Sequence, residues 1–520
     1  MGKKNKTKKI ENYEKVDIDF SPKIPPLKSM TDKTKIDVRY CLISPFAYVH
    51  IYWDEKNNEL RYDLEEPELT EEEKENRSKI TYAMRNLINN EKIVKKSKEA
   101  LLDYIHKRLK IIAIEMGIDL SYKSFKKIYY YMCRDFIGFN EVDPILRDYF
   151  VEDIECNGIN TPVYLIHRKY RNLKTNLVYK DLENLESFVE KLAQRCGKYI
   201  SYAQPILDGS LPDGSRVNAT YTKDITSRGP TFTIRKFTKV PWTPPQLISF
   251  RTLSAEMMAF LWMIVEYKMS LLIAGGTSSG KTTLLNAIAF FIPPEARVVS
   301  IEDTRELNLP RENWLPSVSR NATGVGDLGS VDLYTLLRAS FRQNPDYVIV
   351  GEVRGKEASV LFQGMASGHP SISTLHADSI ETVIKRLETP PIELSPTLMN
   401  VLDSICVMTH AIVNNQDTRK LREVLEIVDV DPNGIATTNT PFKWNSQQDA
   451  FYFKSDSKIF EKIQKRFGMS LNEIYKEFNY RVKLLRKLTQ EEVFGFREFQ
   501  EIVMKYYKEP KEVLRRFGVQ

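Results

Sequence analysis

The spacing of hydrophobic residues changes several times along the chain and predicts where helices and strands lie. Between residues 79 and 135, apolar side chains such as Leu101, Ile105 and Leu109 recur every three or four positions, which predicts helices. Short runs of β-branched and aromatic residues predict strands instead. In the first 240 residues, strands are predicted at 47–53, 163–166 and 231–234, and a further helix at 182–196. This half is therefore predicted to be a mixed α/β domain.

Strand and helix patterns alternate regularly in the second half. Strands are predicted at 270–274, 298–301, 347–350 and 371–375, with helices at 283–291, 333–341 and 357–366. Such alternation predicts a parallel sheet with helices on both faces.

A proline-rich stretch, Val240–Pro245, separates the two halves. Three prolines in five residues are incompatible with a helix or a central strand, so we predict a linker there. The lysine-rich and proline-dotted start has little periodicity and is predicted to be a mobile arm. The predicted organisation is an arm over 1–35, an N-terminal α/β domain over 36–239, a linker over 240–250 and a C-terminal domain over 251–520.

The last part of the second half, residues 455–520, is predicted to be a helical extension. Ser470 and Glu473 form a capping box ahead of an apolar stripe, and Thr489 with Glu492 is predicted to cap another helix. We interpret the extension as an appendage packed on its domain. A dedicated docking element for a partner is the alternative.

Composition narrows the class of protein. The chain is 42% hydrophobic and 28% charged, as in ordinary globular proteins. Its longest apolar run, 257–265, is far shorter than the roughly 20 residues that cross a bilayer, so we expect a cytoplasmic protein. The five cysteines lie far apart and predict neither a zinc site nor disulfides. The net charge of +7 suits an anionic partner without identifying one.

One motif carries specific chemistry. A glycine-rich run follows the strand at 270–274 and opens the next helix, which is the context of a phosphate-binding P-loop. Its backbone N–H groups and the helix N-terminus favour phosphate, while Lys281 is expected to reach the β- and γ-phosphates and Thr282 to bind Mg²⁺. The expected nucleotide-binding residues are Gly275, Gly276, Thr277, Ser278, Ser279, Gly280, Lys281, Thr282 and Thr283.

Acidic residues lie at the ends of two predicted strands, where ligands of parallel sheets collect. Glu302 and Glu306 follow 298–301, and Glu352 follows 347–350 after a glycine. Hydrolysis of ATP needs carboxylates to orient water and to support Mg²⁺, although each of these acids could also be a solvated loop charge. His376 ends the strand at 371–375 and is a candidate sensor of the γ-phosphate, whereas His369 is equally well read as structural.

Arginines stabilise the transition state of phosphoryl transfer. Arg216, Arg228 and Arg235 lie on turn and strand segments of the first half. By themselves they are more simply interpreted as surface residues.

In combination, these segments resemble the secretion superfamily of hexameric ATPases, which drives type II secretion, type IV pilus assembly and the archaellum, and the archaeal branch is most similar. The resemblance covers residues 140–430. The motifs that carry it are the P-loop, an Asp box Ile301–Leu307, a Walker B Pro345–Arg354 with glycine in place of aspartate, a His box from Gly368–His369 to Thr374–His376, and the segments Val151–Ile154 and Leu211–Asn218.

The resemblance implies a RecA-like P-loop ATPase domain joined by a flexible linker to a smaller α/β N-terminal domain, in a ring of six. It implies ATP and Mg²⁺ as cofactors, with Thr282, Glu302 and Glu352 as metal ligands. Glu306 then corresponds to the catalytic acid of the Asp box and Glu352 to that of Walker B, while Arg216, Arg228 and Arg235 reach the nucleotide. The implied partners are a polytopic membrane platform protein and filament-assembly components, with peripheral membrane association. Bacterial type II secretion ATPases often carry a tetracysteine zinc module that this chain lacks, so we expect no zinc, and no nucleic acid is expected as a partner.

Two other readings stay open. A RecA-like nucleic-acid translocating ATPase is disfavoured because Gly351 replaces the usual aspartate and the loop 323–330 has no aromatic residue. A scaffold that binds nucleotide without turnover is the third reading. The motifs do not separate archaellum, pilus and secretion machines.

Overall fold

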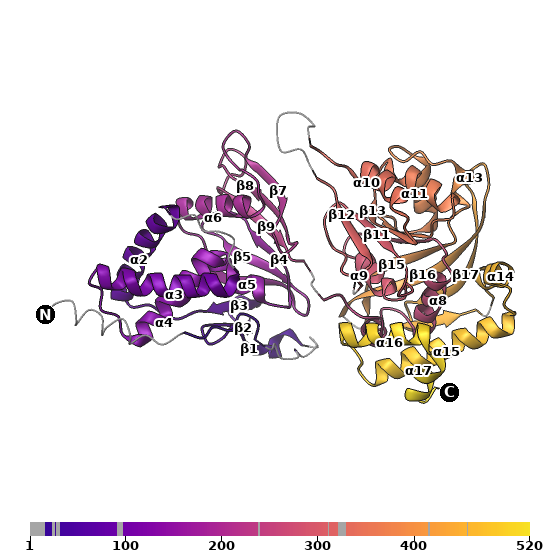
Figure 1. Ribbon diagram of the computed structural model, residues 1–520, viewed down its shortest axis with the longest axis horizontal. Coiled ribbons are helices and arrows are strands. Elements are labelled where there is room, and N and C mark those ends of the chain that lie inside the picture. Colours follow the sequence, from indigo (N-terminus) through magenta and orange to yellow (C-terminus); the bar gives the residue numbers. More distant parts are fainter. Residues whose placement is uncertain are drawn as a thin grey trace. The chain divides into compact units, whose positions relative to one another are not determined.

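The computed structural model describes residues 16–22, 27, 32–90, 97–237, 240–309, 311–320, 329–413, 416–454 and 456–519. The chain forms two compact units, Met1–Phe237 and Thr238–Gln520 (Figure 1). Most of the predicted arm, residues 1–35, lies outside the described residues, as does most of the glycine-rich loop 323–330.

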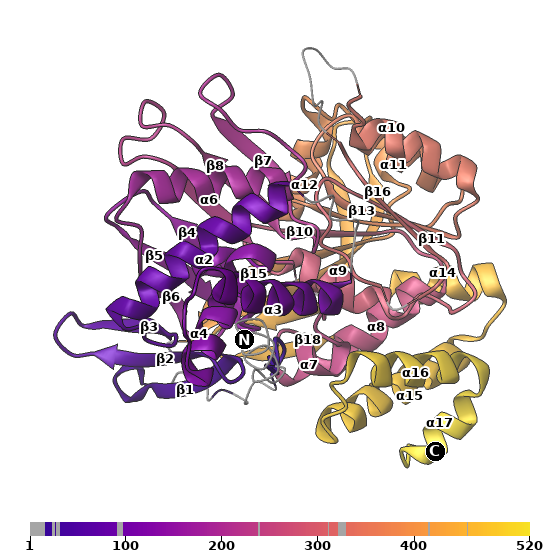
Figure 2. The same cartoon turned by 60° about the vertical axis from the view of Figure 1, so that its left-hand side comes forward.

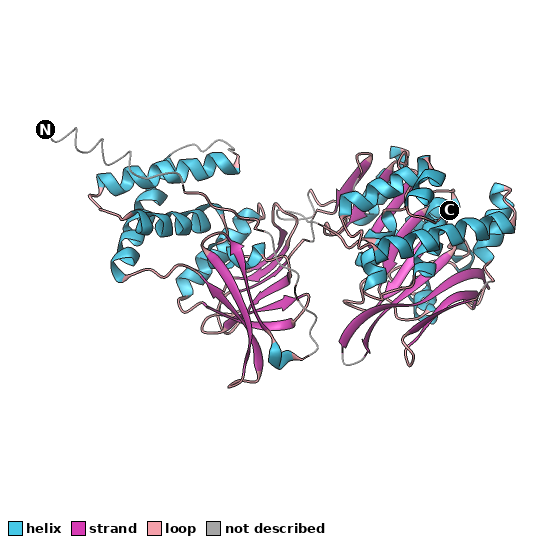
Figure 3. Ribbon diagram, turned by 90° about the horizontal axis from the view of Figure 1, so that it is seen from below, coloured by secondary structure: helices cyan, strands magenta, loops and turns pink. Residues whose placement is uncertain are grey.

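The first unit is built on a nine-stranded sheet of order β1-β2-β3-β6-β5-β4-β9-β8-β7. Its helices lie to one side of the sheet (Figure 3). The strands are β1 Asp37–Ile43, β2 Ala47–Asp54, β3 Glu59–Glu65, β4 Val151–Cys156, β5 Pro162–His167, β6 Arg171–Val178, β7 Ile206–Ser210, β8 Arg216–Thr220 and β9 Thr231–Arg235. The α-helices are α2 Glu71–Asn90, α3 Lys98–Glu115, α4 Tyr122–Met132, α5 Asp143–Arg147 and α6 Leu182–Arg195.

The second unit holds another nine-stranded sheet, of order β12-β11-β13-β14-β10-β15-β16-β17-β18. Strands β12 to β15 in this order are parallel, and β16 to β18 extend the sheet as an antiparallel meander. The strands are β10 Leu271–Gly275, β11 Val298–Glu302, β12 Trp314–Val318, β13 Tyr347–Val353, β14 Ser371–Leu375, β15 Ser404–Val413, β16 Gln416–Val430, β17 Ala436–Asn445 and β18 Ala450–Phe453. The α-helices are α7 Pro244–Ser249, α8 Ala255–Glu266, α9 Lys281–Ala289, α10 Leu333–Ser340, α11 Glu357–Ala366, α12 Ile380–Glu388, α13 Pro396–Met399, α14 Lys458–Phe467, α15 Leu471–Gln490, α16 Phe496–Lys508 and α17 Pro510–Arg516.

Strand β10 is buried on both faces. Leu271 and Ile273 belong to the hydrophobic cluster that includes α8, α9 and the tail helices. Leu272 and Ala274, on the other face, pack with α10, α11 and α12. The parallel sheet with helices on both faces is thus confirmed, and with it the predicted α/β fold class.

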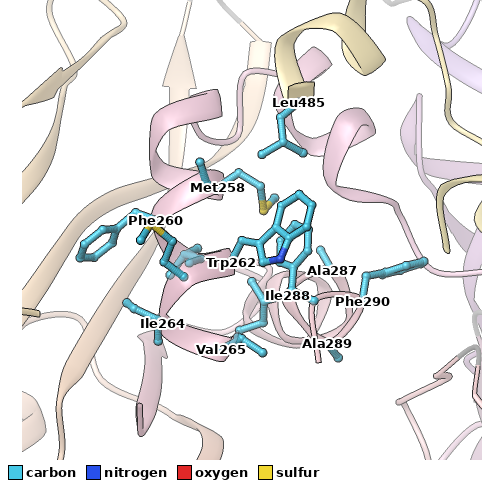
Figure 4. Packing of buried hydrophobic residues seen from close by; sticks show 14 of the residues in the cluster. Met258, Phe260, Trp262, Ile264, Val265, Ala287, Ile288, Ala289, Phe290 and Leu485 are labelled. Atoms are coloured by element: carbon cyan, nitrogen blue, oxygen red, sulfur yellow. The ribbon is translucent and has the colours of Figure 1, made fainter. Parts of the chain in front are cut away.

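The longest apolar run of the chain forms α8, which is apolar all round because it is enclosed on every side. Trp262 of α8 stacks on Phe291 with ring centroids 4.6 Å apart, and Leu485 of the tail lies near Met258 and Trp262 (Figure 4). Burial within the unit, rather than in lipid, accounts for this run. Among the described helices, none is both long and apolar enough to cross a bilayer.

The helical tail is confirmed and packs on its own unit, where α15, α16 and α17 lie side by side (Figures 1 and 2). The capping box of Ser470 and Glu473 starts α15 as predicted. The second predicted cap is wrong: Thr489 lies inside α15 and donates its hydroxyl to the Leu485 carbonyl, and α16 begins only after Gly495.

The proline-rich segment also differs from its prediction, because it contains α7. Pro244 and Pro245 occupy the first positions of this helix, where no intrahelical N–H partner is needed. Thr243 and Gln246 form a capping box in front of it. The prolines therefore open a helix here instead of excluding one.

Candidate nucleotide-binding site

The P-loop connects the carboxyl end of β10 to α9. Gly275 ends the strand, and a Cβ there would lie 2.4 Å from Ser279 Oγ and 2.8 Å from the Met408 carbonyl oxygen. Gly280 caps α9 with φ of 95°, in the left-handed region that favours glycine. Both glycines are therefore required by the shape of the loop.

Polar contacts fold the loop onto itself. Lys281 Nζ donates to the carbonyl oxygens of Gly275 and Gly276 at 3.0 and 2.9 Å. Ser279 Oγ donates to the Gly276 carbonyl at 2.8 Å. Thr282 and Thr283 follow in the first turn of α9, where free N–H groups and the helix dipole favour an anion. All residues predicted to bind nucleotide, including Thr277, thus lie in one loop and one helix turn.

An arginine outside the predicted site also holds the loop. Arg419 of β16 donates its Nε–H to the Ser278 carbonyl oxygen at 2.9 Å. Ser278 has φ of 57°, so this contact fixes a residue in an unfavourable backbone conformation. Because Arg419 lies about 140 residues beyond the P-loop, no local pattern in the sequence could have identified it.

Glu302 is the most perturbed acid near the site. It is the last residue of β11 rather than the first after it, and only 1% of its surface is exposed. Its Oε1 accepts the backbone N–H groups of Glu306 and Leu307 at 2.8 and 2.9 Å. Its Oε2 is buried and has no hydrogen-bond partner within the described residues. Burial raises the pKa of Glu302 to about 7 despite the two N–H donors, so the carboxyl changes charge near neutral pH.

Gly351 stands where the sequence predicts the Walker B aspartate, and it lies against Glu302. A Cβ at Gly351 would lie 3.1 Å from Glu302 Cγ, so the buried glutamate on β11 would have to shift slightly to admit a side chain on β13. Glu352 follows within the same strand, is partly exposed, and pairs with Arg354. Arg354 Nη1 also lies 3.9 Å from Asp303 Oδ2, so these charges form one small cluster.

A buried asparagine joins the P-loop helix to the Asp box. Asn286 of α9 donates from Nδ2 to the carbonyl oxygens of Thr282 and Glu306, at 3.1 and 3.3 Å. Its Oδ1 accepts the Asn308 N–H at 3.0 Å. The structure thus brings Thr282, Glu302 and Glu306 into one hydrogen-bonded neighbourhood, although sequence reasoning missed the asparagine that connects them.

The two histidines differ in surroundings. His369 packs its ring against Phe341, with centroids 5.1 Å apart, and its buried Nδ1 has no partner in the described part of the chain. His376 follows the carboxyl end of β14, the strand next to β10, and is partly exposed. Its place fits the predicted sensor role, whereas the packing of His369 favours a structural role.

The three predicted arginines belong to the first unit, whereas the P-loop belongs to the second. Arg216 and Arg235 face each other across β8 and β9, on the side opposite the buried Val217 and Ile234. Like charges placed directly opposite repel, and Arg216 offsets this by donating to Asp208, with Nη2 and Oδ2 3.1 Å apart. Arg228 lies apart from this pair, in the exposed turn between the two strands.

Comparisons with known proteins identify the family of the chain. A family model described as "Type II/IV secretion system protein" matches residues 164–441, and one described as "PilB3-like, C-terminal" matches residues 447–520. An uncharacterized protein of Methanocaldococcus jannaschii is 38% identical over 75% of this chain and 71% of its own length. The type IV secretion system protein PtlH of Bordetella pertussis is 31% identical over 47% of this chain and 81% of its own.

A solved structure, the ATPase DotB of Legionella pneumophila, aligns with 72% of this chain and 94% of its own at 18% identity and a TM-score of 0.40. The match to the first family model spans more than half of the 520 residues and includes the P-loop and its acids. The alignment with the relative from Methanocaldococcus jannaschii also includes this region. The chain belongs to the type II/IV secretion system protein family.

Proposed function

We propose that this chain is an ATPase that binds ATP with Mg²⁺ at the P-loop and hydrolyses it to power a secretion or pilus-type machine. The observation that carries the proposal is the hydrogen-bonded connection from the buried Glu302, through the Glu306 backbone and Asn286, to the first turn of the helix that follows the P-loop. A phosphate cradle connected to carboxylates that can orient water and support Mg²⁺ provides the groups that hydrolysis of ATP needs.

The residues present fit both nucleotide and metal. Gly275 to Thr283 offer backbone N–H groups to phosphate, and Lys281 exchanges its two carbonyl contacts for phosphate oxygens. Thr282, Glu302 and Glu352 provide the hydroxyl and carboxylate oxygens that Mg²⁺ prefers, and Glu302 Oε2 is a buried oxygen still lacking a partner within the described residues. When bound, Mg²⁺ neutralises charge on the phosphate oxygens.

The remaining roles follow from position in the family motifs. Glu306 is the proposed catalytic acid of the Asp box, and Glu352 is the proposed Walker B acid. The ion pair between Glu352 and Arg354 must break before Glu352 can take this role. His376 is the proposed γ-phosphate sensor. Arg216, Arg228 and Arg235 are proposed to reach the nucleotide when the chain assembles as a hexamer, with the segment 240–250 as the hinge between the domains.

The machine is proposed to be a type IV pilus-like filament or secretion system, such as an archaellum, a pilus or a type II-like exporter. The PilB3-like tail and the similarity to PtlH support this class. A polytopic platform protein at the cytoplasmic membrane would receive the force, with the chain bound peripherally on the cytoplasmic side.

The test is phosphate release by the purified full chain with ATP and Mg²⁺. We expect Lys281→Ala to abolish nucleotide binding and Glu352→Gln to retain it while losing turnover. Lys268→Ala is the matched control, because it removes a lysine at the surface, where Lys268 Nζ lies 3.5 Å from Asp346 Oδ1. If the unmodified chain neither binds nor hydrolyses nucleotide, the proposal is wrong.

A further inference from the structure

We propose that Asn286 is a positioning residue that fixes Glu302 and Glu306 relative to the P-loop through the backbone segment 306–308. This inference rests on the ATP hydrolysis proposed above and concerns a residue whose side chain bonds to backbone groups of the protein. It acts through two segments that are far apart in the sequence.

The contacts of Asn286 are directed and buried. Only 6% of its surface is exposed, and all three of its hydrogen bonds go to backbone groups. One bond goes back to Thr282, in the first turn of its own helix, and the other two go to Glu306 and Asn308. The side chain therefore ties the turn that carries the proposed metal-binding hydroxyl to the segment after β11.

The same backbone segment holds Glu302. The N–H groups of Glu306 and Leu307 bond to Glu302 Oε1, while the Glu306 carbonyl and the Asn308 N–H bond to Asn286. Three consecutive residues thus connect to the acid on one side and to the P-loop helix on the other. The hydrogen-bonded strands set where β11 lies relative to β10, and Asn286 adds a direct connection between the segment after β11 and the turn that carries Thr282.

Few side chains could replace Asn286. The position needs a donor for two carbonyl oxygens and an acceptor for one N–H, on a side chain short enough to reach its own helix backbone. Aspartate has the same shape and keeps the acceptor, but it has no donor and would face the Thr282 and Glu306 carbonyl oxygens. Leucine has a similar volume and makes none of the three bonds.

The test separates nucleotide affinity from turnover in the full chain. We expect Asn286→Leu and Asn286→Asp to bind ATP within about threefold of the unmodified chain, because the P-loop groups are untouched. We expect turnover to fall about 10- to 100-fold, since displacement of a reacting group by about 1 Å costs up to a hundredfold. Affinity is measured with a fluorescent ATP analogue and turnover by phosphate release.

Asn400→Leu is the matched control. Asn400 likewise makes three bonds that join separate segments: Nδ2 donates to Asp429 Oδ1 and the Val430 carbonyl, both at 3.2 Å, and Oδ1 accepts the Val430 N–H at 2.6 Å. We expect this variant to keep normal turnover. Should Asn286→Asp match the control in turnover, or lose affinity and turnover together, the positioning role is refuted. If the unmodified chain lacks turnover, the proposed function fails instead, and affinity for ATP remains a separate readout.

Discussion

Replacing Glu302 with glutamine should make the stability of the protein less dependent on pH. Burial raises the pKa of the Glu302 carboxyl from its usual 4.5 to about 7, so the folded state prefers the protonated form. Its contribution to stability is therefore most favourable at low pH and is lost as the pH rises from 4.5 through 7. Glutamine has no proton to lose and avoids this loss.

The magnitude follows from the two pKa values. One pKa unit corresponds to about 1.4 kcal/mol, so the raised pKa of Glu302 lowers the free energy of unfolding by roughly 3 kcal/mol at pH 8 and by about 1 kcal/mol at pH 5. The free energy of unfolding of Glu302→Gln, relative to the unmodified chain, should thus be about 2 kcal/mol higher at pH 8 than at pH 5. The glutamine NH₂ group would lie where Glu302 Oε2 has no partner within the described residues. Any packing cost of this group is the same at both pH values, so it cancels in the difference between them.

The assay is urea denaturation at both pH values without nucleotide or divalent cations, followed by tryptophan fluorescence. It reports mainly on the second unit, since all tryptophans except Trp53 lie there. Glu55→Gln, at an exposed position of the first unit, controls for the loss of one carboxylate. If the difference between Glu302→Gln and the unmodified chain is the same at both pH values, the reasoning about burial is wrong.

Three further outcomes are expected. Gly275→Ala should abolish nucleotide binding, measured by fluorescence titration, because its Cβ would lie 2.8 Å from the Met408 carbonyl oxygen; undiminished binding would contradict this account of the loop. Gly351→Asp should lower stability by about 1 to 3 kcal/mol in urea denaturation, since its Cβ would crowd Glu302, and a neutral result would show that β13 has room for it. Glu426→Ala should lower the free energy of unfolding by about 2 to 4 kcal/mol, because this buried carboxylate accepts the N–H groups of Lys458 and Ile459 at the start of α14. If this contact were dispensable, the same denaturation assay would show no shift.

The elements around the P-loop could be predicted because their signals are local. The β10 strand, the glycine run and α9 follow one another directly, and β11 and β13 each show a short apolar run. The ends of β11 and β13 were predicted one and three residues too early, so Glu302 and Glu352 belong to their strands instead of following them. Strand ends are set by pairing with neighbours, which the sequence of one strand does not contain.

Other parts of the site depend on tertiary contacts that no local pattern reveals. Asn286 looks like an ordinary polar residue in a helix until the segment 306–308 is packed against it. Arg419 reaches the P-loop only because β16 lies beside β15, and the meander from β15 to β18 was not predicted. The pairing of Arg216 with Arg235 likewise follows from strand register.

The tail helices share one core with the helix that follows the P-loop. Tyr507 of α16 accepts a hydrogen bond from Trp262 Nε1 at 2.9 Å and donates its own hydroxyl to the Phe291 carbonyl, two residues beyond α9. Close-packed interiors yield little under load and pass displacement on to their neighbours. Tension applied to the C-terminal helices would therefore be felt at the end of α9 that lies away from the P-loop. In the proposed ATPase, this shared core would connect a partner bound to the tail mechanically with the proposed nucleotide site.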